Sequence, residues 1–182
     1  MIAKHLVKQV KCGLQNANDE DFQTFVKYFL QNRRIFISGA GRSGLVGKFF
    51  AMRLMHLGNR VFVLGETNTP SIQKGDILVC ISASGTTSSV LNAAKTAKGH
   101  GATIVGVTAN PTGPLKETAE FAVIMDSRNK KKRKKLKRKD RKIPLGTSFE
   151  LSSLMYLEAV VSEIMHICNI GEQTMKERHV NI

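Results

Sequence analysis

Five short apolar runs, each ending in small or polar residues, follow one another between residues 34 and 126. Helical segments lie between the first four runs, and only a short PLKETAE piece precedes the fifth. Nearly continuous apolar runs that alternate with helices are typical of a parallel sheet covered on both faces. Because crossovers between parallel strands are right-handed, we predict a flavodoxin-like, doubly wound three-layer α/β/α sandwich with a five-stranded parallel sheet. The runs are RIFISG, RVFVLG, DILVCIS, ATIVGVT and FAVIMD, and the helical segments include Leu45–Leu57 and Ser88–Lys98.

Amphipathic helices are predicted on both sides of this region. Residues 2–10 and 22–30 place apolar side chains at helical spacing, with a turn region at 16–21 between them. A long helix is predicted after residue 150, and a short one around residues 172–178. These helices supply further layers for the sheet.

The net charge of +14 is concentrated in one segment. Residues 128–142 hold twelve Lys or Arg and one Asp, which gives +11 and leaves +3 for the rest of the chain. Like charges at this density repel, and the segment has almost no apolar surface. We interpret it as a solvated connector within a single domain that spans residues 1–182, rather than as a nucleic-acid-binding patch.

The chain shows no pattern of secretion or membrane insertion. Its N-terminus mixes charge into apolar residues, and no apolar run approaches the roughly 20 residues of a membrane helix. Cys12, Cys80 and Cys168 form no CxxC pair and no cluster of metal-site spacing. We expect a cytoplasmic protein with reduced cysteines and no membrane contact.

A glycine-rich motif follows the first apolar run. RIFISGAGRSG matches GxGxxG at Gly39, Gly41 and Gly44. Such a loop suits any phosphate, because glycines let the backbone approach an anion and the helix start offers free N–H groups. Glu66 stands roughly 20 residues on, where a ribose-binding acid is expected, so a dinucleotide enzyme is one alternative.

A hydroxyl-rich loop follows the third run. DILVCIS continues into ASGTTSS, which places Ser82, Ser84, Thr86 and Thr87 around a predicted helix start. Ser and Thr are good helix caps, but one cap needs one hydroxyl, so we favour phosphate binding over capping. Ligands bind at the carboxyl edge of such sheets, and we expect Ser43 and this loop to face one pocket for a small phosphorylated ligand.

Glu150 and His179 are candidates for proton transfer. Glu150 lies in PLGTSFE at the start of the long helix, with Thr147 or Ser148 as the expected cap, and a first-turn glutamate also complements the helix dipole. His179 lies in the tail, where histidines are often merely exposed. A carboxylate and a histidine together suit proton transfer next to a carbonyl, but spacing alone does not give these two residues that role.

Several motifs together resemble the sugar isomerase (SIS) domain family and, within it, the 6-phospho-3-hexuloisomerase branch. The resemblance implies interconversion of D-arabino-hex-3-ulose 6-phosphate and fructose 6-phosphate in the ribulose monophosphate pathway of formaldehyde fixation, with no metal or organic cofactor. It also implies a homodimer or homotetramer with sites at subunit boundaries. The motifs are GAGRSGLVGKFFAMRLMHLG, VLGETNTPSIQKGDILVCISASGTT, PLGTSFE and MKERHVN.

The same resemblance implies a role for each candidate residue. Glu150 matches the catalytic base, and His179 matches a histidine of the C-terminal motif that can act in a neighbour's site. We expect donors such as Arg42 to stabilise the negative charge of a 2,3-enediolate. Thr86 stands where the branch frequently carries glutamate. The expected substrate-binding residues are Arg42, Ser43, Ser82, Ala83, Ser84, Gly85, Thr86 and Thr87.

Two further functions stay open at this point. Another aldose–ketose isomerase, acting on arabinose 5-phosphate or glucosamine 6-phosphate, would use the same phosphate loop. A non-catalytic sugar-phosphate sensor is the other alternative, although no DNA-binding motif precedes residue 34.

Overall fold

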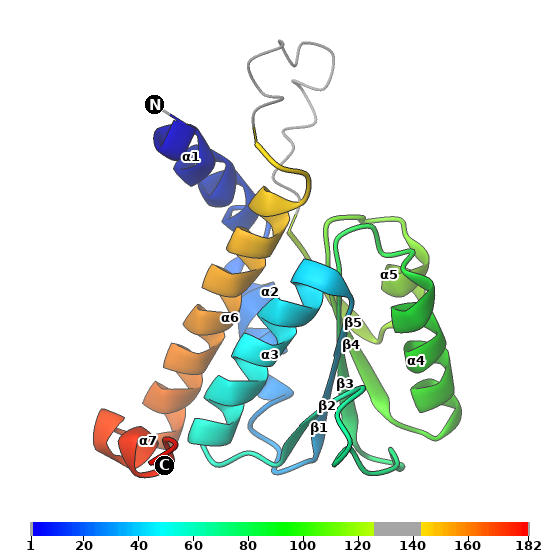
Figure 1. The fold of residues 1–182 in the computed structure, drawn as a ribbon, viewed down its shortest axis with the longest axis vertical. Coiled ribbons are helices and arrows are strands. Elements are labelled where there is room, and N and C mark those ends of the chain that lie inside the picture. The colour runs from blue at the N-terminus through cyan, green and yellow to red at the C-terminus, as the bar shows by residue number, and fades with distance from the viewer. Residues whose placement is uncertain (1, 126–142, 182) are drawn as a thin grey trace.

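The structure, a computed structural model, describes residues 2–125 and 143–181, so the basic segment predicted to be a connector at 128–142 lies outside the described residues. Five parallel strands form one sheet in the order β2-β1-β3-β4-β5 (Figure 1). This is the flavodoxin-like strand order, and the predicted fold class is confirmed. The elements are α1 (Ile2–Leu14), α2 (Asp19–Lys27), β1 (Ile35–Gly39), α3 (Gly41–His56), β2 (Val61–Val63), β3 (Ile77–Ser82), α4 (Ser88–Gly99), β4 (Thr103–Thr108), α5 (Pro114–Thr118), β5 (Phe121–Ile124), α6 (Thr147–Cys168) and α7 (Glu172–Glu177).

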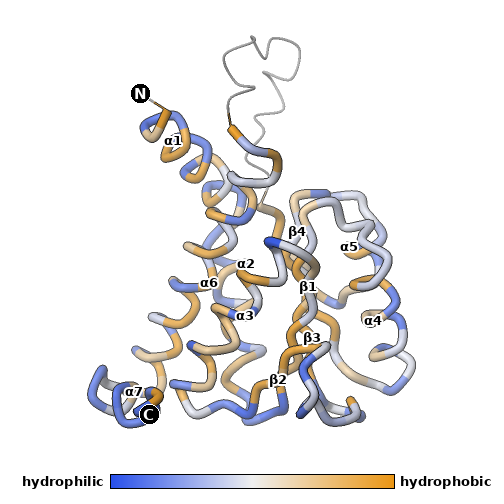
Figure 2. Tube along the Cα trace, viewed as in Figure 1, coloured by the Kyte–Doolittle hydropathy of each residue, from blue (hydrophilic) through white to orange (hydrophobic). Residues whose placement is uncertain are grey.

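Helices cover both faces of the sheet and give the predicted three layers (Figure 1). α2, α3 and α6 pack on one face, with α1 against α6, whereas α4 and α5 pack on the other. Ile35 and Ile37 of β1 contribute to the first core and Phe36, between them, to the second, as the alternation of a strand requires. Figure 2 shows these strands as a hydrophobic centre between the helices. Because α3 and α4 lie on opposite faces, the topological switch point falls between the carboxyl ends of β1 and β3.

The predicted boundaries differ from the structure in three places. The connection from β2 to β3, residues 64–76, contains no helix; Pro70 and a run of turns replace the expected helical segment. α3 begins at Gly41 rather than at residue 45, so the glycine motif forms its first turn. α2 begins at Asp19, inside the predicted turn region, because the side chain of Asn18 caps it.

α6 is long and apolar enough to cross a membrane by length and composition, and it is the one such helix in the described part of the chain. Its inner face, including Tyr156, Leu157 and Val160, is buried against the first core. We therefore interpret α6 as a core helix of this domain. Its apolar character continues onto the outer face, where Met155 is exposed.

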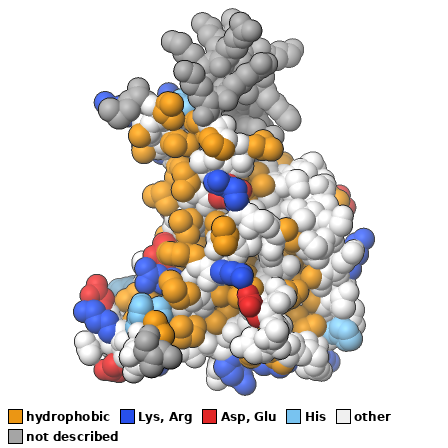
Figure 3. All heavy atoms as spheres, in the orientation of Figure 1, with side chains coloured by type: hydrophobic (Ala, Val, Ile, Leu, Met, Phe, Trp, Pro, Cys, Tyr) orange, Lys and Arg blue, Asp and Glu red, His pale blue; other side chains and the backbone are white. Residues whose placement is uncertain are grey.

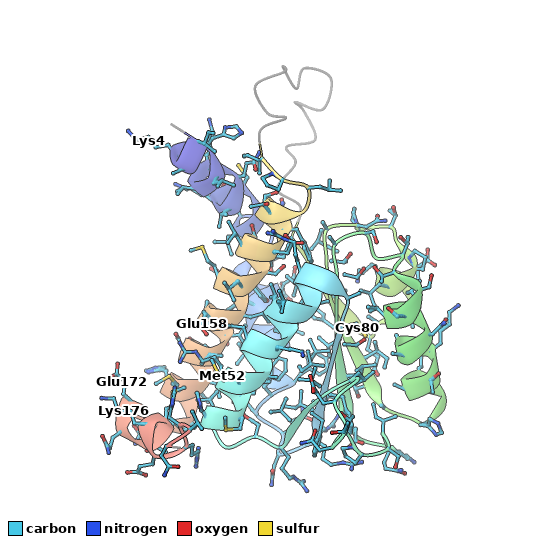
Figure 4. All side chains as sticks on the ribbon, in the orientation of Figure 1. Lys4, Met52, Cys80, Glu158, Glu172 and Lys176 are labelled. Carbon is cyan, nitrogen blue, oxygen red and sulfur yellow. The ribbon has the colours of Figure 1, made fainter. Side chains whose placement is uncertain are left out.

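The three cysteines are free. Cys80 lies in β3 inside the sheet (Figure 4), and burial raises the pKa of its thiol to about 12. Cys12 is half-buried and Cys168 is exposed.

Candidate functional site

The two loops predicted to bind phosphate start side by side at the carboxyl edge of the sheet. β1 and β3 are hydrogen-bonded neighbours, and Gly39 pairs with Ile81 at their ends. α3 follows β1 directly, and α4 follows the hydroxyl loop, residues 82–87. Neither Ala40 nor Thr87, the N-cap residues of the two helices, makes a side-chain cap hydrogen bond. Both helices therefore present uncapped N–H groups and the positive ends of their dipoles at the same edge.

The hydroxyls of the hydroxyl loop bond one another and loop amides instead of capping α4. Ser82 Oγ lies 2.9 Å from Thr87 Oγ1 and accepts from the N–H of Gly85 at 3.2 Å. Ser84 Oγ accepts from the N–H of Thr86 at 3.2 Å and from its hydroxyl at 3.0 Å. Capping of α4 does not account for these residues. Their hydroxyls and amides form a set of donors suited to the oxygens of an anion.

The glycines of GAGRSG bring β1 and α3 into close contact. A Cβ on Gly44 would lie 2.8 Å from the carbonyl oxygen of Gly39, and one on Gly39 would lie 3.0 Å from the Cα of Gly44. Gly41, with φ of +54°, turns the chain from the strand into the helix. Strand–helix packing thus accounts for the glycine spacing without a dinucleotide. Ser43, in the first turn of α3, is buried beside this contact.

Charged groups at this edge pair within the chain. Glu66, the acid that the dinucleotide alternative assigns to a ribose, lies 2.6 Å from the Nζ of Lys48 on α3. Both side chains are about half exposed. Within the described residues, no group of three or more His, Cys, Asp and Glu side chains is arranged to hold a metal ion.

An ion pair between Arg42 and Glu150 joins the glycine motif to the start of α6. Arg42 Nε donates to Glu150 Oε2 at 2.8 Å, and the side chains are 55% and 11% exposed. The N-cap of α6 is Gly146, so the prediction of Thr147 or Ser148 as the cap is wrong. A Cβ on Gly146 would lie 2.7 Å from Glu150 Oε1, so a larger residue there would make this carboxylate shift. The structure therefore places the largely buried carboxylate of Glu150 next to Arg42 of the glycine motif.

His179 lies at the far end of α3 from Glu150. Its ring stacks on His56, with 4.9 Å between centroids and 24° between planes, and Arg178 donates to the carbonyl oxygen of His56 at 3.0 Å. His56 ends α3, whereas Arg42 stands in its first turn, about 21 Å away at the helical rise per residue. The predicted pair of Glu150 and His179 is not brought together within the chain.

Sequence reasoning missed a third group of residues at this edge, the segment after β4. Asn110 Nδ2 donates to the carbonyl oxygen of Ser84 at 3.0 Å. The hydroxyl of the fully buried Thr108 accepts from the N–H of Asn110 at 3.1 Å. A signal was present, since TANPTG places polar residues directly after a buried strand next to β3.

A family model, that of the SIS domain, matches residues 28–136, more than half of the chain. The chain belongs to the SIS domain family. The family membership predicted from the motifs is therefore confirmed. In this SIS domain, the uncapped N-termini of α3 and α4 lie at the carboxyl edge of β1 and β3.

Several relatives of this SIS domain protein carry the same enzyme name. It is 38% identical over 168 residues to the 3-hexulose-6-phosphate isomerase of Methanocaldococcus jannaschii, covering 91% of this chain and 87% of that protein. It is 40% identical over 149 residues to the 3-hexulose-6-phosphate isomerase of Methylomonas aminofaciens, covering 82% and 80% of the two chains. A hypothetical protein of Methanococcus jannaschii, whose crystal structure infers the molecular function of 3-hexulose-6-phosphate isomerase, matches with a TM-score of 0.81 at 34% identity over 97% and 96% of the chains.

Proposed function

We propose that this SIS domain protein interconverts D-arabino-hex-3-ulose 6-phosphate and fructose 6-phosphate, as in the ribulose monophosphate pathway of formaldehyde fixation. The observation that carries the proposal is the largely buried carboxylate of Glu150, held by Arg42 at an edge with two uncapped helix N-termini. An anion site and a base then meet at one edge of the sheet. The similarity to named isomerases supports the choice of substrate pair. Because both substrates are free sugar phosphates, the proposal includes a cytoplasmic location.

The reaction moves a proton between two neighbouring carbons. Glu150 takes the proton from C2 of the hexulose phosphate, and the C3 ketone becomes part of a 2,3-enediol. The same carboxyl group returns the proton to C3, and the O2 hydroxyl proton moves to O3, which leaves the ketone of fructose 6-phosphate at C2. Arg42, whose Nε lies 2.8 Å from Glu150 Oε2, supplies a donor for the negative charge of the enediolate.

The phosphate binds between the hydroxyl loop and the start of α3 in this proposal. The hydroxyls of Ser82, Ser84, Thr86 and Thr87 exchange their mutual hydrogen bonds for phosphate oxygens. The amides at the uncapped start of α4 complete the anion site. Ala83 and Gly85 contribute backbone to this loop, and Ser43 stands on the neighbouring α3 side.

A homodimer or homotetramer with sites at the subunit interfaces is part of the proposal. Leu151 and Met155, on the outer face of the N-terminal half of α6, are exposed, and apolar side chains grouped on a surface often mark a contact with another subunit. Figure 3 shows hydrophobic side chains in a band along the face that carries α1 and α6. Leu145, five residues before Glu150, is 99% exposed, so apolar surface extends to the site. A groove between α1 and α6 is lined by Leu6, Val7, Val10, Lys11, Leu14, Gln15, Leu151, Leu154 and Met155.

The same assembly gives His179 a role in a neighbour's site. In a two-fold dimer with antiparallel helices, the His179 end of one copy meets the Glu150 end of the other. An imidazole can open the furanose ring of fructose 6-phosphate or carry a hydroxyl proton there. His56, on which His179 stacks in the single chain, is then the support of the donated side chain.

A coupled assay tests the proposed reaction. Hexulose 6-phosphate is made enzymatically from ribulose 5-phosphate and formaldehyde, the purified protein is added, and fructose 6-phosphate is measured. We expect formation of fructose 6-phosphate that depends on this protein. Turnover of arabinose 5-phosphate or glucosamine 6-phosphate in its place would contradict the substrate but keep the class, and binding without any turnover would indicate a sensor.

A further inference from the structure

Three consecutive carbonyl groups of the hydroxyl loop are all held by one segment, residues 109–115. The N–H of Ala109 donates to the carbonyl oxygen of Ala83 at 3.1 Å, and the N–H of Leu115 donates to that of Gly85 at 3.0 Å. Between them, the carbonyl oxygen of Ser84 accepts from a side chain, the Nδ2 of Asn110, at 3.0 Å. Asn110 therefore fills the one position in this row where the backbone of the segment supplies no donor to the loop.

The position of Asn110 is itself fixed on several sides. Its N–H donates to the hydroxyl of the buried Thr108 at 3.1 Å, and its Oδ1 accepts from the N–H of Thr112 at 3.2 Å. A Cβ on Gly113 would lie 2.7 Å from Asn110 Nδ2, so the chain passes close to the carboxamide. These contacts orient the carboxamide of Asn110 so that its donor, Nδ2, faces the Ser84 carbonyl oxygen.

Holding a carbonyl also orients the amide that follows it. In a planar trans peptide unit the C=O and N–H groups point in opposite directions. The carbonyl groups of Ala83, Ser84 and Gly85 point toward residues 109–115. The N–H groups of the residue after each carbonyl therefore point away from that segment. The N–H groups of Gly85 and Thr86 indeed donate to loop hydroxyls.

We propose that Asn110 is a positioning residue for phosphate binding: its side-chain amide keeps the Ser84 carbonyl oxygen turned away from the bound phosphate. A released carbonyl would present partial negative charge to an anion and would take the following amide out of reach of it. Asn110 touches neither the phosphate nor the reacting carbons. The inference rests on the proposed phosphate site and names one residue that shapes it.

Two variants of the full-length protein test the inference. Asn110→Asp keeps the shape but replaces the donor by an oxygen, and Asn110→Ala removes the donor without adding charge. We expect inorganic phosphate to raise the Tm of the wild type and to raise that of both variants much less. For fructose 6-phosphate we expect KM to rise about tenfold or more with a smaller change in kcat, because the proton-transfer residues are untouched. Thr112→Val is the control, since the Thr112 hydroxyl donates to Asn110 Oδ1 and not to the loop-facing Nδ2 side of the carboxamide.

The outcomes separate this inference from the proposed function. A phosphate-induced rise in Tm and a KM like those of the wild type in Asn110→Ala would overturn the role of Asn110 while leaving the isomerase intact. A lower Tm without phosphate, combined with unchanged KM, would show a purely structural residue and would overturn it as well. Absence of turnover by the wild type in the coupled assay would instead count against the proposed function.

Discussion

Glu150 and Glu158 stand two turns apart on α6, and each pairs with an arginine of α3. Arg42 Nε lies 2.8 Å from Glu150 Oε2, and Arg53 Nε lies 3.0 Å from Glu158 Oε1. The pairs are alike in chemistry but differ in surroundings, since the Glu150 side chain is 11% exposed and that of Glu158, labelled in Figure 4, is 37% exposed. Of these two arginine–glutamate pairs, only Arg42–Glu150 lies at the carboxyl edge of the sheet.

These two glutamates make a matched pair of variants. Glu150→Gln removes the base, and we expect kcat to fall about 10²- to 10⁴-fold while fructose 6-phosphate still binds. Glu158→Gln removes a comparable charge from an ion pair that is about one third exposed, for which we expect near-normal kcat and a loss of stability of about 0–1 kcal/mol. Steady-state kinetics and ligand-induced changes in Tm measure both effects. Near-normal turnover by Glu150→Gln would contradict the assignment of the base.

The positions of the strands were predictable, but the contacts between distant elements were not. The apolar runs predict β1, β3 and β4, because a buried parallel strand needs apolar side chains on both faces. The contact between Arg42 and Glu150 spans 108 residues and depends on how α3 and α6 cross, which no local pattern records. The polar residues around Asn110 could be found from their place after a buried strand, but its contact with Ser84, 26 residues away on another loop, could not.

The first turn of α6 is built on a glycine, contrary to the prediction of a hydroxyl cap. Gly146 has φ of +86°, and a Cβ there would lie 2.7 Å from Glu150 Oε1. We expect Gly146→Ala to cost about 1–2 kcal/mol from the left-handed backbone alone and to lower kcat by displacing the carboxylate. Thermal or denaturant unfolding and steady-state kinetics measure the two effects.

Gly99→Ala is the matched control for that variant. Gly99 lies in α4, and a Cβ there has no heavy atom within 4 Å. We expect Gly99→Ala to raise stability by about 0.4–1 kcal/mol and its activity to stay as in the wild type. If Gly146→Ala behaved in the same way, Gly146 would have no part in holding Glu150.

At the scale of the whole molecule, the C-terminal segment is tied to the end of α3 through a buried histidine. Burial lowers the pKa of His56, and the nearby charges of His179 and Arg53 lower it further. The unfolded chain therefore takes up a proton at this position at a higher pH than the folded protein does. By linkage, the free energy of unfolding falls as the pH drops below about 6.5.

A substitution isolates this contribution to acid sensitivity. We expect His56→Gln to lose less stability than the wild type between pH 7.5 and 5.5, because carboxylates elsewhere contribute equally to both proteins. His100→Gln, at an exposed histidine, controls for the loss of a histidine side chain. Denaturant unfolding at the two pH values gives the comparison. An equal loss in wild type and His56→Gln would show that protonation of His56 does not oppose folding.

Whether His179 acts in its own subunit or in a neighbour's is decided by mixing inactive subunits. In the single chain His179 lies by His56, at the opposite end of α3 from Arg42 and Glu150, so the proposed chemistry needs a second copy to join the two residues. We expect Glu150→Gln and His179→Ala to be nearly inactive alone. In a mixed dimer one site then combines the Glu150 of one copy with the His179 of the other.

Random mixing of the two variants at equal amounts should restore about a quarter of the wild-type activity, because half of the dimers are hybrids and each hybrid has one intact site. The subunits are unfolded and refolded together, and mass spectrometry of the intact assembly confirms that hybrids form. Mixing Glu150→Gln with Glu150→Ala is the control, since no hybrid of these two can regain the base. Hybrids of Glu150→Gln and His179→Ala without recovered activity would place both residues in the same subunit's site and would contradict the shared interface.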